Sequence, residues 1–229
     1  NNMFLQLFFN NPLLGAVWLG AILISLTVHE FAHALIANRL GDKTAEYEGR
    51  LTLNPLSHID PMGLIMLIIL GFGWVKPVPY NPYNLADPRR GAVLIGLAGP
   101  ASNIILATIA ALGLRALSLS GGGLEISNLL VAGLFLLVIV NLFLAFFNLI
   151  PVPPLDGSKV LDALLTKPQH AKLRIALHTW GPKALMLFVF LAIFGVFDIF
   201  NFLAIPAFLS CDALTGESCA NILSLIFSL

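Results

Sequence analysis

Two histidines and a glutamate lie within five residues of each other, in the segment His29-Glu30-Phe31-Ala32-His33. In a helix, residues four apart share one face, so the two imidazoles can bind one metal ion. Neutral imidazole nitrogens bind Zn²⁺ at about 2.0–2.1 Å. Glu30 is turned by about 100° from His29, so its carboxylate can reach metal-activated water without ligating the metal. This is the HExxH pattern of zinc-dependent proteases, in which the glutamate is the general base.

The composition places this segment in a membrane protein. Of the 229 residues, 58% are hydrophobic and 10% are charged, and the mean hydropathy is +0.91. Soluble domains carry about 25% charged residues, and a net charge of zero gives no indication of nucleic acid. We predict one all-α polytopic domain over residues 1–229, embedded in the lipid bilayer, with about four transmembrane helices and one re-entrant or interfacial segment. The predicted spans are residues 13–40, 91–117, 129–151 and 184–205, and the short segment is 62–74.

The placement of lysine and arginine predicts the orientation. If the spans alternate and residues 62–74 dip in and return, all but one of the 12 basic residues fall on one side, and Arg115 lies near the other. Basic loops stay in the cytosol. We therefore expect the N-terminus and the C-terminal tail outside, and the HExxH segment in the cytosolic half of its span. The small size and this orientation favour a prokaryotic plasma membrane.

Inside a membrane helix the HExxH pattern becomes more specific. Ionisable side chains cost about 2.5–3.5 kcal/mol each at the helix centre, so they are retained where they face a cavity and bind something. The alternative is a pair of buried neutral histidines that hydrogen-bond to neighbouring helices, with Glu30 paired or protonated. We expect the metal site.

A catalytic zinc site needs a third protein ligand and an open position. Asp156 follows the proline-rich break Pro151-Val-Pro-Pro-Leu directly after the third predicted span. Non-helical backbone is tolerated at membrane depth where it lines a cavity. Asp156 could equally be the N-cap of a helix that begins at Gly157. The predicted topology favours the ligand, because Asp156 and the two histidines lie toward the same side.

The chain resembles the site-2 protease family of intramembrane zinc metalloproteases. That family pairs HExxH in one core helix with an N-x-x-P-x-x-P-x-D-G-like motif that ends another. This sequence carries HEFAH at 29–33 and Asn148-Leu-Ile-Pro151-Val-Pro153-Pro154-Leu-Asp156-Gly157, and Gly99-Pro100-Ala101-Ser102-Asn103 matches the intervening core helix. The resemblance covers a core of about residues 13–165. It implies a minimal member without a PDZ or CBS domain, completed by a C-terminal helix and an outward-facing tail at 184–229.

The resemblance implies one Zn²⁺ per chain, held by His29, His33 and Asp156, with Glu30 activating zinc-bound water. It also implies that Asn148 holds the substrate backbone or stabilises the oxyanion, although Asn148 could instead make an interhelical hydrogen bond. The implied reaction is hydrolysis of peptide bonds within or next to transmembrane segments of membrane protein substrates. The alternative is a catalytically inactive metal-binding scaffold or an ion transporter. Glu30 argues against it, because neither needs an unligated acid beside the metal.

Four further residues receive accessory assignments. His58 precedes the re-entrant segment and is a candidate gate, with a loop-stabilising histidine as the alternative. Asn103 is a candidate accessory residue of the cavity, although Gly99 and Ser102 beside it could simply permit close helix packing. Cys211 and Cys219 lie in the tail placed outside, where an oxidising environment permits a disulfide. Two free thiols, or a tail without fixed structure, are the alternatives. The segment 71–82 is either an extended edge for an unwound substrate or an interfacial anchor.

Overall fold

The computed structural model describes residues 8–119, 128–194 and 200–226. These ranges form helices joined by turns and extended segments, and their only β-pairing is an isolated bridge between Ile59 and Val75. Four helices are long and apolar enough to cross a membrane. The predicted all-α polytopic membrane fold is therefore confirmed. The four helices are α2 (Pro12–Arg39), α5 (Pro88–Leu119), α6 (Leu129–Asn148) and α8 (Ala171–Ile193).

Local capping residues explain where two of these helices begin. Asn11 caps α2, because its side-chain oxygen accepts the N–H of Leu14 at 3.1 Å and Pro12 follows at the first helical position. Asn128 caps α6 in the same way by accepting the N–H of Leu130. Such side chains satisfy amide groups that the first helical turn leaves unpaired. The end of α6 at Asn148 is earlier than predicted, since Pro151 cannot continue the helix.

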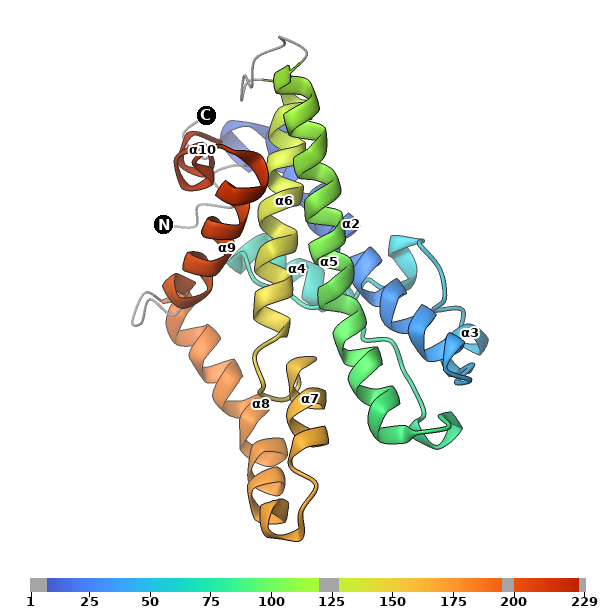
Figure 1. Cartoon of the computed structure of the whole chain (residues 1–229). Helices are drawn as coiled ribbons and strands as arrows, with labels where there is room; N and C mark the ends of the chain where they lie inside the picture. Colours follow the sequence, from blue (N-terminus) through green and yellow to red (C-terminus); the bar gives the residue numbers. More distant parts are fainter. Residues whose placement is uncertain (1–7, 120–127, 195–199, 227–229) are drawn as a thin grey trace.

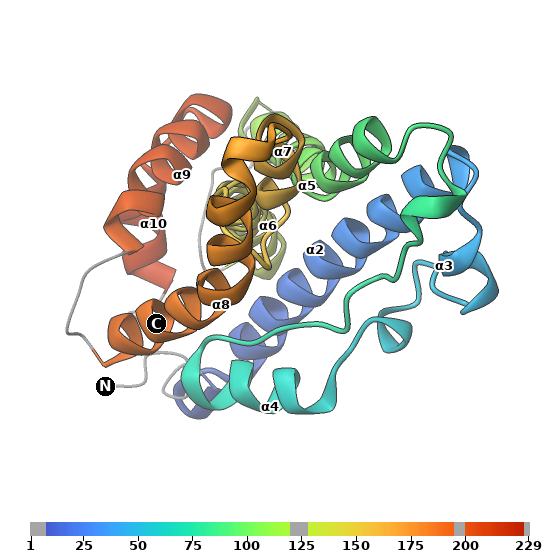
Figure 2. The same cartoon turned by 90° about the horizontal axis from the view of Figure 1, so that it is seen from below.

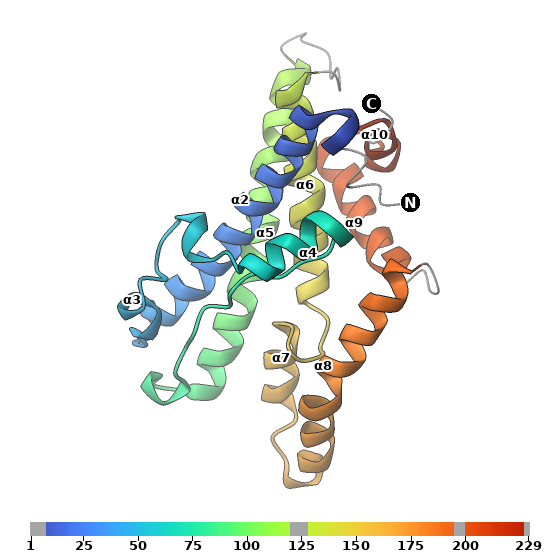
Figure 3. The ribbon, with the colours of Figure 1, turned by 180° about the vertical axis from the view of Figure 1, so that it is seen from behind.

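Helices α2, α5 and α6 form the centre of the molecule and run roughly side by side in Figures 1 and 3. Alanines lie where they pack together, and small residues let membrane helices approach closely. A fifth apolar helix, α9 (Phe200–Thr215), packs against α6. Buried alanines of these helices include Ala21, Ala107, Ala110, Ala132, Ala145 and Ala207.

The predicted short segment forms α4 (Pro61–Leu70), a helix of 10 residues. At 1.5 Å per residue it is about 15 Å long, which is half of a hydrocarbon core. Figures 2 and 3 show it lying across the bundle beside α2. Residues 72–81, here called the strap, return from α4 in an extended conformation. Gly63 permits this return, because a Cβ atom there would clash with the carbonyl oxygen of Trp74.

Short elements at one end of the bundle complete the connections. In Figure 1 the lower end carries α3, η2, α7 and the beginning of α8. Asp42 ties the end of α2 to the strap, because its carboxylate accepts the N–H of Asn81 at 2.6 Å and the side-chain amide of Asn84 at 2.8 Å. The short elements are α3 (Thr44–Tyr47), η1 (Pro55–Ser57), η2 (Pro82–Asn84), α7 (Gly157–Leu164) and η3 (Pro168–His170).

The C-terminal region differs from the sequence-based expectation in its helix bounds. The fourth long helix, α8, begins at Ala171 instead of near residue 184, and part of the predicted span, residues 195–199, lies outside the described residues. Lys172, Arg174 and Lys183 precede the predicted start near residue 184. However, long basic side chains lie along apolar surface while their charged ends reach water, so they do not end the apolar helix.

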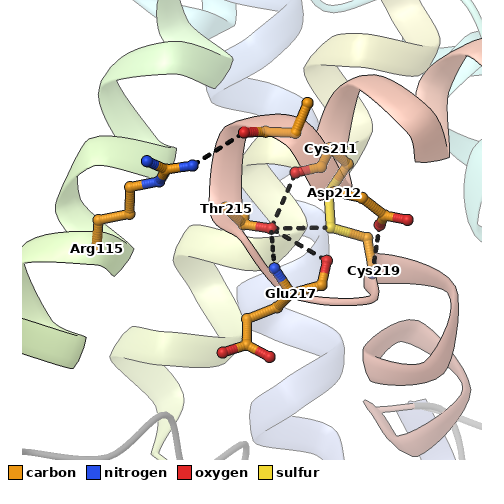
Figure 4. Close-up of a disulfide and its surroundings, with 7 residues drawn as sticks. Arg115, Cys211, Asp212, Thr215, Glu217 and Cys219 are labelled. Carbon is orange, nitrogen blue, oxygen red and sulfur yellow. Dashed lines mark hydrogen bonds between the residues drawn. A yellow bond between two sulfur atoms is a disulfide. The ribbon is translucent and has the colours of Figure 1, made fainter.

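The predicted tail is folded over its described residues. It forms the second half of α9 and α10 (Cys219–Ile226), which pack against α6 at the upper end of Figure 1. A disulfide joins Cys211 and Cys219 (Figure 4). Around it, Asp212 accepts the N–H of Cys219 at 2.7 Å, and Arg115 from α5 donates to the carbonyl of Ala213 at 2.9 Å. These contacts hold α9 and α10 together and attach them to α5.

Candidate metal centre and active site

His29 and His33 on α2 meet Asp156, which lies between α6 and α7. Oδ2 of Asp156 lies 3.1 Å from Nε2 of His29 and 3.0 Å from Nε2 of His33, and the two Nε2 atoms are 3.1 Å apart. All three residues are buried. Ligand atoms about 2.0–2.1 Å from a tetrahedral zinc are separated by about 3.3 Å. The three atoms therefore form a triangle close in size to one face of a zinc tetrahedron, and the residues fit the metal.

The opposite nitrogen of each imidazole has its own partner. Nδ1 of His33 lies 2.6 Å from the backbone carbonyl of Ile95 on α5, which can only accept a hydrogen bond. A neutral His33 therefore carries its proton on Nδ1 and presents the lone pair of Nε2 to the metal position. Nδ1 of His29 lies 2.6 Å from Oδ1 of Asn103, also on α5. Partners of this kind orient metal-ligating histidines.

Helix α5 also supplies a flat surface beneath the two histidines. A Cβ atom added to Gly99 would lie 2.5 Å from Cε1 of His29 and 2.5 Å from Nε2 of His33. The ligand atoms therefore occupy space that any other residue at position 99 would fill. Glycine is required here for close approach, not for an unusual backbone angle.

Asp156 is held by a residue that the sequence analysis did not select. Lys159, one helical turn further on α7, donates from Nζ to Oδ1 of Asp156 at 2.7 Å. Its ammonium also lies 5.7 Å from the centre of the Tyr80 ring in the strap. The lysine occupies one carboxylate oxygen and leaves the other, Oδ2, facing the histidines. The i, i+3 spacing in a short amphipathic helix could have indicated this pair.

Glu30 lies beside the ligand triangle without belonging to it. Its side chain is buried, and Oε2 accepts the backbone N–H of Val78 in the strap at 2.9 Å. No side-chain pattern predicts a backbone donor of this kind. A cavity of about 270 Å³ connects these groups. It is lined by His29, Glu30, His33, Pro77, Val78, Tyr80, Ile95, Asn148, Pro154, Asp156 and Lys159.

The accessory residues differ in whether they reach the site. Asn148 lines the cavity, and its Nδ2 donates to the carbonyl of Leu144 at 3.0 Å within its own helix, instead of making the interhelical hydrogen bond that was the alternative. Asn103 contacts His29. His58 is buried among loops, where Nε2 lies 2.9 Å from the carbonyl of Thr52, and it is not among the residues that line the cavity. The structure therefore gives His58 the contacts of a loop-stabilising histidine.

Two further polar residues contact Asn103, the hydrogen-bond partner of His29. Asn141 on α6 and Ser25 on α2 are both fully buried and hydrogen-bond to each other and to Asn103. Asn141 is a polar residue within the third predicted span. Polar groups inside a membrane helix mark functional positions, and this signal could have found it.

The chain is similar to bacterial proteins whose names state a chemistry. It is 42% identical to "Putative zinc metalloprotease YwhC" of Bacillus subtilis over 157 residues, which are 66% of this chain and 70% of that protein. Residues 119–192 match the family model for peptidase family M50, the site-2 protease family. The chain belongs to peptidase family M50. The part of the chain that the family model matches contains Asp156 but not the HExxH motif.

More distant relatives of this M50 chain carry names of the same kind. It is 33% identical over 165 residues to "Putative zinc metalloprotease Rip2" of Mycolicibacterium smegmatis, covering 69% of this chain and 61% of that protein. It is 26% identical over 158 residues to "Zinc metalloprotease MJ0392" of Methanocaldococcus jannaschii, covering 69% of this chain and 37% of that protein. No solved structure matches the chain. Family membership, the ligand cluster and the apolar helices together make it an integral membrane zinc metalloprotease that acts on protein substrates.

Proposed function

We propose that this M50 chain cleaves peptide bonds within or beside transmembrane segments of its substrates. In this proposal His29, His33 and Asp156 hold one Zn²⁺, and Glu30 is the general base. The observation that carries the proposal is the arrangement of one cavity. Three buried ligand atoms form a triangle there, and the carboxylate of Glu30 lies beside the triangle without being one of the ligands. The helices around this cavity are long enough to span a bilayer.

The chain's own residues would perform the proton transfers. When bound, zinc supplies a Lewis acid that makes water acidic near neutral pH and polarises a carbonyl. Glu30 accepts the proton of the attacking water and returns it to the nitrogen of the leaving amine. The N–H of Val78 fixes one oxygen of the Glu30 carboxylate. This bond orients the base relative to the ligand triangle.

We assign Asn148 to the substrate. Its side chain lines the cavity, and the hydrogen bond to Leu144 uses one of its two amide protons. The other proton is available to a substrate oxygen, because a primary amide carries two N–H donors. A donor aimed at the developing oxyanion lowers the barrier to acyl transfer.

We further propose that the site lies in the cytosolic half of the membrane. His33 is six residues from the end of α2 at Arg39, a distance of about 9 Å along the helix. The loops at that end carry most of the basic residues of the chain, which favours a cytosolic location. Lys159 and Tyr80 line the cavity there and offer polar groups to entering water.

The test compares metal content and cleavage in the purified full chain. We expect wild type and Glu30→Gln to bind one zinc each, while cleavage of a model transmembrane peptide falls by about 10²–10⁴-fold in Glu30→Gln. Asp156→Ala should lose the zinc. Equal cleavage by wild type and Glu30→Gln would exclude the assigned base, and undiminished zinc binding by Asp156→Ala would exclude the assigned ligand.

A further inference from the structure

A continuous chain of buried hydrogen bonds crosses the bundle from α6 to His29. Nδ2 of Asn141 lies 2.7 Å from the carbonyl of Leu137 and 2.7 Å from Oγ of Ser25. Nδ2 of Asn103 lies 2.7 Å from Oδ1 of Asn141 and 3.3 Å from the carbonyl of Ser25. Oδ1 of Asn103 then lies 2.6 Å from Nδ1 of His29.

The direction of this chain is fixed by a backbone carbonyl. Since the carbonyl of Leu137 can only accept, the group of Asn141 that faces it must be the NH₂ group. Oδ1 of Asn141 then faces Asn103 and can also only accept. Asn103 must therefore turn its NH₂ group toward Asn141 and its oxygen toward His29.

The same logic places the proton of His29. The oxygen of Asn103 requires a donor 2.6 Å away, and Nδ1 of His29 is the atom that occupies this position. A neutral imidazole with its proton on Nδ1 has its lone pair on Nε2, the atom that belongs to the ligand triangle. The reversed amide would instead favour a proton on Nε2, which must be lost before the nitrogen can bind a metal.

We propose that Asn141 and Ser25, acting through Asn103, are positioning residues that fix the proton of His29 on Nδ1 and prepare Nε2 to bind zinc. The inference rests on the proposed zinc site. His33 needs no such relay, because the carbonyl of Ile95 fixes its proton directly. The two histidines of one motif are thus oriented by different devices, one a backbone carbonyl and the other a directed relay across three helices.

The relay consists of Ser25, Asn103 and Asn141, and its burial keeps water from competing for its hydrogen bonds. Ser25, Asn103 and Asn141 are each 0% exposed. The hydroxyl of Ser25 donates to the carbonyl of Ala21 at 2.7 Å, so its oxygen is left to accept from Asn141. Every side-chain amide proton of the two asparagines then has an acceptor. Such a satisfied network holds a single orientation.

The test measures the zinc dissociation constant of the full chain by chelator competition. Asn141→Leu leaves the Asn103 amide held only by its longer contact of 3.3 Å to the carbonyl of Ser25. We expect zinc affinity to fall by about 10–100-fold, the usual effect of losing a partner that orients a metal ligand. Ser25→Ala is the milder variant and should lower affinity by a smaller factor. Thr27→Val is the control, because this buried hydroxyl on the same helix bonds only within α2, to the carbonyl of Leu23.

A rescue variant separates orientation from packing. Aspartate at position 103 presents an acceptor to His29 whichever way it is turned, so it no longer needs Asn141. We expect Asn103→Asp to restore zinc affinity to within a few fold of wild type in combination with Asn141→Leu, which removes the opposing oxygen of Asn141. A role of Asn141 in packing alone would not be rescued by a change at Asn103.

The outcomes are distinct. Wild-type affinity in Asn141→Leu and Ser25→Ala, or lost affinity that Asn103→Asp does not restore, would overturn the relay. Where Asn141→Leu does not fold, Ser25→Ala compared with wild type and with Thr27→Val decides the same question. A wild type that binds no zinc, or one whose affinity is unchanged by His29→Ala, would instead exclude the proposed metal site itself.

Discussion

At the residue scale, function depends on which atoms face the metal position. The HExxH spacing predicted that His29 and His33 would share a face, and the structure brings their Nε2 atoms within 3.1 Å of each other. Three hydrogen-bond partners orient the ligands: a backbone carbonyl for His33, the amide of Asn103 for His29, and a lysine for the aspartate. Only the amide of Asn103 was selected from sequence. Carbonyls carry no residue-type signal, and the i, i+3 spacing of Lys159 from Asp156 indicates a contact only where the segment is helical, as it is in α7.

Gly99 provides a sharp test at this scale. An added methyl group would lie 2.5 Å from Nε2 of His33 and 2.6 Å from Nε2 of His29, so Gly99→Ala should displace the ligand atoms and lower zinc affinity by at least about 10-fold. Gly113→Ala on the same helix is the matched control, because its methyl group would meet Leu134 at an ordinary 3.5 Å. Zinc affinity measured by chelator competition should be unchanged in the control. Equal affinities for Gly99→Ala and wild type would contradict the arrangement of α5 beneath the histidines.

At the element scale, the strap determines where the base points. Pro77 and Pro79 exclude a regular helix here, and the extended conformation follows, but the sequence could not show that this segment crosses α2 beside Glu30. The contact is made through a backbone N–H and depends on tertiary placement. In the C-terminal region, the basic residues before position 184 placed the fourth span too late, because long basic side chains can lie along an apolar helix without ending it.

Removing the strap's hydrogen bond should separate base orientation from metal binding. Val78→Pro deletes the N–H that Glu30 accepts, and Pro77 and Pro79 already hold the flanking residues extended, so the backbone path should persist. We expect the cleavage rate to fall by about 10-fold or more, with zinc content unchanged. Val78→Ala keeps the N–H and should retain wild-type cleavage. A loss of the same size in Val78→Ala would show that the side chain, not the hydrogen bond, matters.

The attachment of the strap predicts a pH dependence. Burial raises the pKa of Asp42, but hydrogen bonds from Thr44, Asn84 and Asn81 outweigh it and hold the pKa below its ordinary value. A carboxylate with a lowered pKa stabilises the fold above its unfolded pKa of about 3.9 and loses this contribution as pH falls further. Thermal unfolding of Asp42→Asn should therefore show a weaker decline than wild type between about pH 4 and pH 3. Glu48→Gln, an exposed neighbour, should decline as wild type does.

At the scale of the whole molecule, the basic residues are concentrated toward one end of the helix bundle. In Figure 1 α3 and the start of α5 lie at the lower end, and the end of α5 lies at the upper end near α10. Most basic residues belong to the lower end, whereas Arg115 lies toward the upper end, where it bonds to α9. This asymmetry could be read from the sequence because it needs only the spans and their order.

The charge asymmetry makes a prediction about intact cells. Tyr47 and Leu119 are 81% and 89% exposed. They are the last residues of α3 and α5, and Figure 1 shows α3 and the end of α5 toward opposite ends of the bundle. The chain's two cysteines are joined in a disulfide, so a new cysteine would be the only free thiol. A membrane-impermeant maleimide should label Leu119→Cys in intact cells, and should label Tyr47→Cys only after permeabilisation, because basic loops face the cytosol. The reverse pattern would place the ligand cavity in the outer half of the membrane, and substrates would then have to be cleaved near their external ends.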